Sequence, residues 1–267
     1  MGVQTEITLE EVQKLFRDKD IKTLTPTRYG VMDTTYILDN FVLKKYERDM
    51  GDKISQDIKL LDRLRANSLN TTKFIKSADE WYLYERLNGL TPISVKYFHI
   101  QALARFLAKF HKITYKQNCS SRFVQNYDIA KILRYTKENF YLYYKKLQEL
   151  EKFKMRDDGF IHGDIFKDNT LFDGQKVAVF DFIDGGCGEF AFDIAVSLIS
   201  FNPYQKSSLN RVFLNTYNQH APKKIKVKEL KQHLKKASKL YALLRIDKYK
   251  SSLYSKELLK IVSKIKY

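Results

Sequence analysis

The segment 160–196 combines one histidine, several aspartates and one asparagine with a short apolar hairpin. Asp164 lies in a loop, and Asn169 follows it five positions later. A hairpin that turns at Asp173-Gly174 then ends at Asp181. Oxygen ligands of this kind suit Mg²⁺ that is shared with the phosphates of a nucleotide, and a further carboxylate can orient and deprotonate a hydroxyl. The segment therefore indicates phosphoryl transfer, with Asn169 and Asp181 as ligands of Mg²⁺ and Asp164 as the base.

Two motifs in this segment resemble those of the aminoglycoside phosphotransferase and choline kinase-like branch of the protein kinase fold. The first, H-G-D-x-x-x-x-N, matches 162–169, and the second, D-F-x-D-x-G-x-G-x-x-x-x-D-[LI]-A, matches 181–195. The resemblance implies that His162 braces the catalytic loop and that Asp193 accepts hydrogen bonds from the backbone of that loop. The alternative is that these aspartates cap turns and helices, as aspartate and asparagine often do.

The spacing of apolar residues predicts a series of strands and helices. The predicted strands are 24–29, 34–38, 41–46, 73–77 and 81–87, and helices are predicted to begin at Thr8, Asp52 and Ser94. Glu11 completes a capping box with Thr8. The segment 123–153 is rich in aromatic residues and is expected to be helical.

The resemblance implies an α+β, bilobal protein-kinase-like fold. An antiparallel sheet with one main helix would make the N-terminal lobe, and the C-terminal lobe would be mainly helical. The glycine and proline that follow Leu87 mark a natural boundary between them. We therefore expect a nucleotide-binding lobe at 1–88 and a catalytic and substrate-binding lobe at 89–267.

A loop between the first two predicted strands is placed where it can cover phosphates. It holds a single glycine, so by itself it indicates nucleotide binding only weakly. In the related kinases a loop of the form G-x-x-[ND]-T-T-Y covers the nucleotide, and the matching residues here are Gly30, Asp33, Thr34, Thr35 and Tyr36. The resemblance also implies ATP with Mg²⁺ as the cofactor, with adenine bound by the backbone between Glu85 and Leu87.

Two adjacent lysines, Lys44 and Lys45, end the third predicted strand. Since side chains alternate across a strand, only one of them can share the face of Val42. The resemblance assigns Lys44 to the α- and β-phosphates, and the alternative is an ordinary solvent-exposed lysine. Related kinases pair this lysine with a glutamate on the next helix, and the corresponding residue here is Asp57. Because aspartate is one methylene shorter, the pair would be longer, bridged by water or supplied by another residue.

Length and composition are those of a globular protein of 267 residues, long enough to bury a substantial core. No uncharged apolar run approaches the roughly 18 residues that a membrane-spanning helix needs. The N-terminus has neither a basic start nor an apolar core of a secretory signal. The two cysteines, Cys119 and Cys187, stand far apart, which predicts separate thiols in a reducing cytoplasm rather than a disulfide.

The net charge of +17 is concentrated towards the C-terminus. Residues 221–267 contain fifteen lysines and arginines against three acidic residues. Such a segment is compatible with nucleic acid or an acidic membrane surface as a partner. The lysines alternate with leucines and isoleucines at helical spacing, however, which favours a solvated lysine face on helices that pack into the core. We therefore expect neither a membrane nor nucleic acid as a partner.

The family phosphorylates hydroxyl groups of aminoglycosides, choline, ethanolamine, methylthioribose and homoserine. The opening MGVQTEITLEEVQKLF and the segment 164–169 are similar to those of the kinase-fold homoserine kinases. Homoserine is a zwitterion and requires one basic and one acidic partner. Lys239 or Arg245, in a loose counterpart of an aromatic C-terminal helix of those enzymes, would bind its carboxylate, and Asp184 its ammonium. The alternative for each is an ordinary surface role.

Other classes of function remain as alternatives. Aminoglycosides are polycations and require a pocket lined with carboxylates, which the basic C-terminal half disfavours, although Glu189 and Asp184 keep that hypothesis open. A protein kinase is disfavoured because no arginine stands between His162 and Asp164 and no A-P-E sequence follows Asp181. A catalytically silent module that binds nucleic acid is disfavoured because the catalytic and metal positions are all present. The sequence thus favours an ATP-dependent small-molecule kinase, with homoserine ahead of an aminoglycoside, choline or ethanolamine as acceptor.

Overall fold

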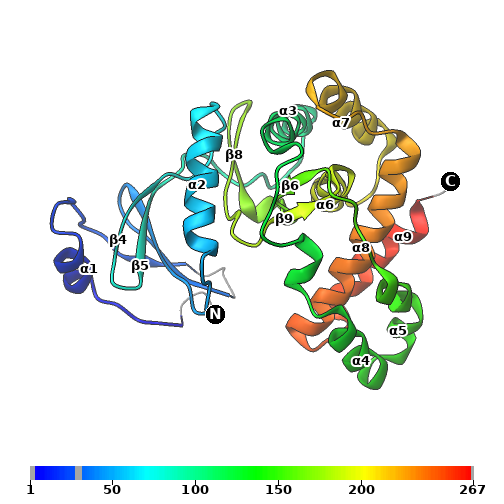
Figure 1. Ribbon diagram of the computed structural model, residues 1–267, viewed down its shortest axis with the longest axis horizontal. Coiled ribbons are helices and arrows are strands. Elements are labelled where there is room, and N and C mark those ends of the chain that lie inside the picture. Colours follow the sequence, from blue (N-terminus) through cyan, green and yellow to red (C-terminus); the bar gives the residue numbers. More distant parts are fainter. Residues whose placement is uncertain (1–3, 28–31, 266–267) are drawn as a thin grey trace. The chain divides into compact units, whose positions relative to one another are not determined.

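The chain divides into two compact units in this computed structural model, which describes residues 4–27 and 32–265. The first unit extends to Gly89 and also includes Ala178–Ile183. The second unit comprises Leu90–Val177 and the chain from Asp184 onward. The first is built on a sheet and the second is mainly helical, so the α+β class expected from the sequence is confirmed (Figure 1).

The first unit contains one five-stranded antiparallel sheet of order β1-β2-β3-β5-β4. Its strands are β1 (Thr25–Pro26), β2 (Thr34–Ile37), β3 (Phe41–Lys45), β4 (Phe74–Ala78) and β5 (Trp81–Glu85). β3 lies at the centre, where Leu43 is opposite both Tyr36 and Leu83. All three side chains are buried, because directly opposed residues of antiparallel strands project to the same face of the sheet. Lys44, the next residue, therefore projects to the other face.

Two helices, α1 (Leu9–Leu15) and α2 (Lys53–Ala66), lie on opposite sides of these strands (Figure 1). α1 begins with the capping box expected from the sequence, in which Thr8 Oγ1 accepts from the N–H of Glu11 and the Glu11 carboxylate accepts from the N–H of Thr8. Val12 and Phe16 bury their side chains against the face of the sheet that holds Leu43. The buried apolar residues of α2 are Leu60, Leu61 and Leu64.

The second unit is built from helices with short connections. Its α-helices are α3 (Tyr97–Thr114), α4 (Ile129–Asn139), α5 (Tyr141–Leu147), α6 (Phe190–Phe201), α7 (Ser207–His220), α8 (Val227–Tyr249) and α9 (Lys256–Lys264). The 3₁₀-helices are η1 (Phe123–Asn126), η2 (Gln148–Lys152), η3 (Lys167–Asn169) and η4 (Leu253–Ser255). α6 is apolar around nearly its whole circumference and is buried accordingly. α3 packs against α7, and α8 packs against both α6 and α9.

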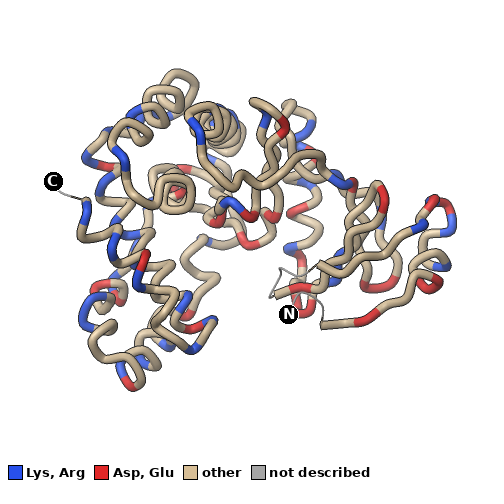
Figure 2. Tube along the Cα trace, turned by 180° about the vertical axis from the view of Figure 1, so that it is seen from behind, with Lys and Arg blue, Asp and Glu red and all other residues tan. Residues whose placement is uncertain are grey.

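The C-terminal helices separate their leucines from their lysines, as the sequence predicts. Leu230, Leu234, Leu240 and Leu243 are buried along α8. Lysines and arginines recur along α8, α9 and the neighbouring helices near the C-terminal end (Figure 2). The positive charge of this region is therefore carried by helices whose apolar side chains are buried in the core.

Two short strand pairs carry the segment 160–196. β6 (Gly159–Ile161) and β9 (Gly186–Gly188) pair antiparallel. β7 (Thr170–Asp173) and β8 (Lys176–Val179) form the predicted hairpin, and Gly174 in its turn has a φ of +56°. The end of β8 belongs to the first unit, since the N–H of Val179 donates to the carbonyl of Asn70 at 3.1 Å. The first unit is therefore made of two separate segments of the chain and not of one continuous stretch.

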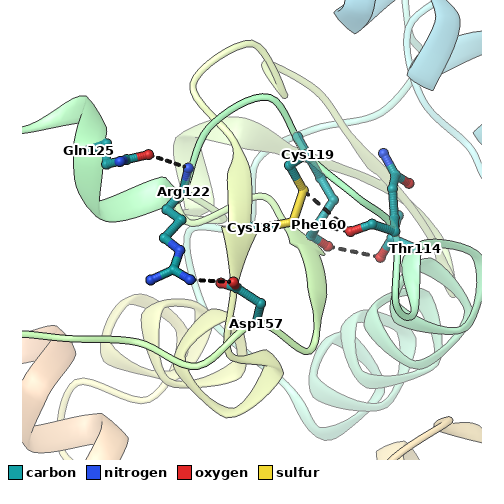
Figure 3. Close-up of a disulfide and its surroundings, with 8 residues drawn as sticks. Thr114, Cys119, Arg122, Gln125, Asp157, Phe160 and Cys187 are labelled. Carbon is teal, nitrogen blue, oxygen red and sulfur yellow. Dashed lines mark hydrogen bonds and ion pairs between the residues drawn. A yellow bond between two sulfur atoms is a disulfide. The ribbon is translucent and has the colours of Figure 1, made fainter.

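Cys119 and Cys187 form a disulfide, so the expectation of two separate thiols is wrong (Figure 3). Their Cα atoms are 5.6 Å apart although 68 residues separate them in sequence. The loop after α3 runs beside β9, where the N–H of Cys187 donates to the carbonyl of Ser121 at 3.0 Å. Only this packing brings the two sulfur atoms together, which is why their spacing in sequence did not indicate it.

The helices formed by residues 4–27 and 32–265 include none that is long and apolar enough to cross a membrane.

Candidate active site

The loop that follows β6 holds Asp164 and Asn169 in direct contact. The side-chain nitrogen of Asn169 donates to the backbone carbonyl of Asp164 at 2.8 Å and to its Oδ2 at 3.0 Å. The N–H of Asp164 donates to Nδ1 of His162 at 3.1 Å. Since the Asn169 amide nitrogen faces Asp164, the amide oxygen is the atom that can serve as a ligand for a cation. His162 thus supports the backbone of the loop, and Asn169 orients the carboxylate of Asp164.

Asp193, at the start of α6, accepts two backbone hydrogen bonds from the same loop. The N–H of His162 donates to its Oδ2 at 3.1 Å, and the N–H of Gly163 donates to its Oδ1 at 2.8 Å. The carboxylate is fully buried. Burial opposes its ionisation, but the hydrogen bond from His111 and those from the loop hold the pKa of Asp193 below its usual value. An ionised carboxylate therefore anchors the catalytic loop on α6.

His111 completes this buried network. Its Nε2 lies 3.1 Å from Asp193 Oδ2 and its Nδ1 lies 2.7 Å from the hydroxyl of Tyr217. The imidazole stacks on the ring of Phe190 at a centroid distance of 4.0 Å. Burial lowers the pKa of His111 despite the neighbouring Asp193, so the neutral ring donates from Nε2 and accepts at Nδ1. His111 therefore holds the carboxylate of Asp193 in place.

Gly163 is required in the loop for two independent reasons. Its φ of +75° lies in the left-handed region. A Cβ at this position would also lie 2.0 Å from a ring carbon of Phe123. The sharp turn between His162 and Asp164 therefore depends on a residue without a side chain.

In the first unit, Lys44 forms ion pairs with two carboxylates. Its Nζ lies 2.8 Å from Asp181 and 3.3 Å from Asp33. Burial of the ammonium favours its neutral form, but these two carboxylates outweigh that effect and hold the pKa of Lys44 above its usual value. The adjacent Lys45 points to the other face and pairs with Glu80 at 2.7 Å. Lys44 is therefore the lysine of this pair whose ammonium contacts Asp33 and Asp181.

The acidic partner of Lys44 from the N-terminal segment is Asp33, whereas the sequence indicated Asp57. Thr35 lies directly opposite Lys44, so Asp33, two residues before it, projects to the same face. Asp57 is buried on α2, and the two carboxylates that pair with Lys44 are those of Asp33 and Asp181. The carboxylate of Asp57 lies instead near the Tyr84 hydroxyl, where it adds to the effect of burial in raising the pKa of Tyr84 to about 12.

Asp181 has an unusual backbone conformation at the end of β8. Its φ of +69° lies in the left-handed region, which aspartate tolerates better than most residues. Conformations of this kind cost about 1–3 kcal/mol and concentrate at functional sites. The side chain of Asp181 is 41% exposed, so it remains accessible to a ligand while it binds Lys44.

The remaining nucleotide-loop candidates have different surroundings. Gly30 lies outside the described residues. Thr34 is fully buried, and its hydroxyl accepts from the N–H groups of Gln4 and Thr5 and donates to Glu47. Its assignment as a nucleotide ligand stays a prediction. Thr35 is half-buried on the face of Lys44.

The predicted adenine-binding segment has most of its donors in use. The N–H of Glu85 donates to the carbonyl of Lys73 at 2.8 Å, and that of Arg86 donates to the carbonyl of Asn40 at 3.0 Å. The N–H of Leu87 makes no hydrogen bond with the described residues. Leu87 is therefore the residue of this segment whose N–H can bind a base.

The structure separates the two basic candidates on α8. Lys239 pairs with Glu149 of η2 at 2.9 Å, and its assignment to the substrate stays a prediction. Arg245 lies over the ring of Phe166, a loop residue, at 5.9 Å. Residues two positions apart project to nearly opposite sides of a helix, whereas Tyr241 and Arg245, four apart, share one face. Asp184 lies between β8 and β9, where its carbonyl accepts from Asn126 at 2.6 Å.

Sequence reasoning gave no role to Tyr241, although its hydroxyl donates to the carbonyl of Gly163. The available signal was its spacing of four residues from Arg245. In the described residues no group of three or more histidine, cysteine or acidic side chains could hold a metal ion. Asn169 in the second unit and Asp181 in the first each carry a hard oxygen atom of the kind that Mg²⁺ prefers.

A kinase-like fold with this loop and this lysine defines a small-molecule phosphotransferase. Residues 23–224 match the phosphotransferase enzyme family (APH), and the chain belongs to that family. The resemblance inferred from the two motifs is thereby confirmed. Two curated relatives are homoserine kinases. That of Polaromonas naphthalenivorans is 23% identical over 74% of this chain and 72% of its own length. That of Methylobacillus flagellatus is 25% identical over 81% and 77%.

Solved structures of low sequence identity share the fold. A gentamicin complex of APH(2'')-IIa superposes with a TM-score of 0.65 at 18% identity, covering 98% of this chain and 97% of the other. The amicoumacin kinase hAmiN, in complex with AMP-PNP and Ca²⁺, gives 0.68 at 16% identity, covering 91% and 87%. The macrolide 2'-phosphotransferase MphH from Brachybacterium faecium gives 0.66 at 14%, covering 97% and 99%. The protein-kinase-like fold expected from the sequence is therefore confirmed.

Proposed function

We propose that this protein transfers the γ-phosphoryl group of ATP to the hydroxyl of a small molecule, and that the acceptor is homoserine. The observation that carries the reaction type is the pair Asp164 and Asn169, held at 3.0 Å on a loop that Asp193 anchors. A fixed carboxylate beside an amide oxygen is what in-line transfer to a hydroxyl requires.

The residues take the following roles in this proposal. Asp164 accepts a hydrogen bond from the acceptor hydroxyl and takes its proton as the bond to phosphorus forms. Asn169 and Asp181 would hold Mg²⁺, which supplies positive charge against the phosphate oxygens. Lys44 neutralises the phosphates that do not react, and Asp33 keeps its ammonium charged and oriented. Catalysis then rests mainly on positioning and charge stabilisation.

The nucleotide is bound by two further groups. The N–H of Leu87 serves as the donor to adenine, beside Glu85. Thr35 of β2 lies directly opposite Lys44 and contacts the phosphates. This assignment makes the first unit responsible for ATP and the second for the acceptor, which agrees with the separation of Lys44 and Asp164 between the two units. We also propose a cytoplasmic location, where ATP is abundant.

Homoserine is favoured as the acceptor by two observations. The curated relatives that cover most of this chain are homoserine kinases. Arg245 lies beside the catalytic loop, where its guanidinium can bind the carboxylate of an amino acid, and Asp184 follows the Asp181 segment, where it can bind the ammonium. An aminoglycoside is the second candidate, supported by the shared fold of the aminoglycoside phosphotransferases. Choline and ethanolamine carry no carboxylate and would leave Arg245 without a role.

A screen of ADP release with homoserine, choline, ethanolamine, methylthioribose and aminoglycosides tests the proposal. We expect ATP turnover with homoserine and formation of O-phosphohomoserine, detected by mass spectrometry. Turnover with an aminoglycoside and none with homoserine would identify an aminoglycoside as the acceptor instead. No turnover with any acceptor, together with salt-dependent binding of nucleic acid, would favour the silent nucleic-acid-binding module instead.

A further inference from the structure

We infer that Tyr241 is a positioning residue of the catalytic loop, whose hydroxyl holds the peptide plane that leads into Asp164. The inference rests on the proposed function, since it concerns the group that receives the proton. Tyr241 lies on α8, 78 residues from the loop in sequence, and is 7% exposed. Its hydroxyl donates to the backbone carbonyl of Gly163.

The peptide between Gly163 and Asp164 is held at both of its polar ends. Its carbonyl accepts from Tyr241, and its N–H donates to Nδ1 of His162 at 3.1 Å. Since a peptide group is planar, two hydrogen bonds on opposite edges fix its orientation. Without the first, the plane could rotate about its Cα–Cα axis.

The peptide on the other side of Asp164 is held as well. The carbonyl of Asp164 accepts from the side chain of Asn169 and from the N–H of Phe166, both at 2.8 Å. Both peptide planes that flank the Cα of Asp164 are thus fixed, and with them the direction of its Cα–Cβ bond. Tyr241 is the member of this set that does not belong to the loop, so it ties the base to α8.

The hydroxyl and the ring of Tyr241 make separate contacts. The ring packs edge-on against Phe166 at a centroid distance of 4.8 Å and would do so without its hydroxyl. Gly163 is buried, so loss of the hydroxyl leaves its carbonyl without this partner. Phenylalanine at position 241 therefore removes the positioning contact and keeps the packing.

The hydroxyl remains a donor throughout the working pH range. Burial, reinforced by the nearby carboxylate of Asp164, raises the pKa of Tyr241 well above its usual value. The phenol therefore stays protonated beside the carboxyl group of Asp164. Tyr241 cannot act as the base itself and serves by holding the loop.

The test compares three variants of the full chain with wild type, using ATP, Mg²⁺ and homoserine. Tyr241→Phe removes only the hydroxyl, and Tyr241→Leu removes the ring as well. Tyr249→Phe is the matched control, because Tyr249 lies on the same helix, is 45% exposed and contacts Tyr254 and Lys248. The readouts are kcat, KM for each substrate, the thermal midpoint, and the number of ATP-binding sites per chain by calorimetry.

We expect Tyr241→Phe to lower kcat about 10- to 100-fold per ATP-binding site, with both KM values unchanged, because a displaced base costs rate and not affinity. Normalising to ATP-binding sites keeps the result valid for a partly unfolded variant. A merely structural role would lower the thermal midpoint and the number of sites, and leave kcat per site intact. Tyr249→Phe should match wild type throughout.

Two outcomes separate the inference from the function on which it rests. An active wild type together with an equally active Tyr241→Phe overturns the role of Tyr241 alone. A loss of kcat per site in Tyr241→Leu but not in Tyr241→Phe assigns the effect to packing and also overturns it. A wild type that transfers phosphate to no acceptor overturns the proposed function first and the inference with it.

Discussion

His111 and Asp193 form a buried pair at 3.1 Å, although 82 residues separate them in sequence. The pair supports the loop that holds Asp164, because Asp193 also accepts hydrogen bonds from the N–H groups of His162 and Gly163. The ionised carboxylate and the neutral imidazole are both required for this arrangement, so the stability of the protein should depend on pH through these two groups.

Acid should destabilise the protein through His111. Its folded-state pKa lies below the unfolded value near 6.5, so the unfolded chain binds the extra proton and stability is lost as the pH falls below that value. The expected slope is about 1.4 kcal/mol per pH unit for one proton, measured by urea unfolding between pH 7 and pH 5. His111→Gln should flatten the slope, and His220→Gln, at an exposed residue, should not. Equal slopes for wild type and His111→Gln would contradict the assignment.

A second loss of stability is expected at lower pH through Asp193. A carboxyl whose folded-state pKa is depressed stabilises the fold above its unfolded pKa, and this contribution disappears as the pH falls through the folded pKa. Asp193→Asn should therefore be less stable than wild type at pH 7, and the difference should shrink below about pH 4. Urea unfolding at pH 7 and pH 3 measures it. A difference that does not change with pH would count against an ionised Asp193.

Asp164→Asn should abolish most turnover and leave nucleotide binding intact. The amide cannot take the proton of the acceptor, and removal of a general base costs about 10²–10⁴-fold in rate. Steady-state ADP release and calorimetric titration with ATP measure the two properties separately. Asp168→Asn is the matched control, since Asp168 is an exposed residue of the same loop. Near wild-type turnover of Asp164→Asn would refute the assignment of the base.

Lys44→Met should weaken ATP binding, whereas Lys45→Met should not. Loss of the ammonium would remove the charge that we propose neutralises the phosphates, and Asp33 and Asp181 would lose their partner. We expect a KM for ATP about 10- to 100-fold higher, the factor that corresponds to one charge-assisted hydrogen bond. If the two substitutions raised the KM for ATP equally, the side of β3 on which the lysine lies would have no effect on ATP binding.

Arg245→Ala should raise the KM for homoserine and leave the KM for ATP unchanged. The guanidinium lies beside Phe166 of the catalytic loop, and its loss would remove the partner of the acceptor's carboxylate. An increase of about 10- to 100-fold is expected for one charged hydrogen bond. Lys239→Ala provides the comparison, because Lys239 pairs with Glu149 and should have little effect. If both variants keep the wild-type KM, the carboxylate site lies elsewhere.

Reduction of the Cys119–Cys187 disulfide should destabilise the second unit. A closed loop of 68 residues corresponds to about 4 kcal/mol in the chain-entropy description. Urea unfolding with and without dithiothreitol measures this difference, and the double variant Cys119→Ser with Cys187→Ser should not respond to reductant. Disulfides are rare in the cytosol, so thiol labelling of protein taken directly from cells tests the proposed location at the same time. Two free thiols in the purified, oxidised protein would contradict the disulfide.

The sequence by itself determined the reaction class and the α+β kinase-like fold. The residues that carry these conclusions act over short distances along the chain: Asp164 and Asn169 share one loop, Thr8 caps its own helix, and Gly174 turns its own hairpin. Interactions within a few residues depend on local backbone geometry, and spacing in sequence specifies that geometry.

Only the tertiary structure decided which distant partners meet. Asp33 rather than Asp57 faces Lys44, Cys119 is bonded to Cys187, and Tyr241 reaches Gly163. Each contact depends on how whole helices and strands pack. Packing is driven by burial of apolar surface, which places a helix as a unit. The apolar pattern of a helix therefore does not specify which polar group its polar residues will contact. The neighbours of the two basic residues of α8 are a further example, since Arg245 lies against Phe166 and Lys239 pairs with Glu149.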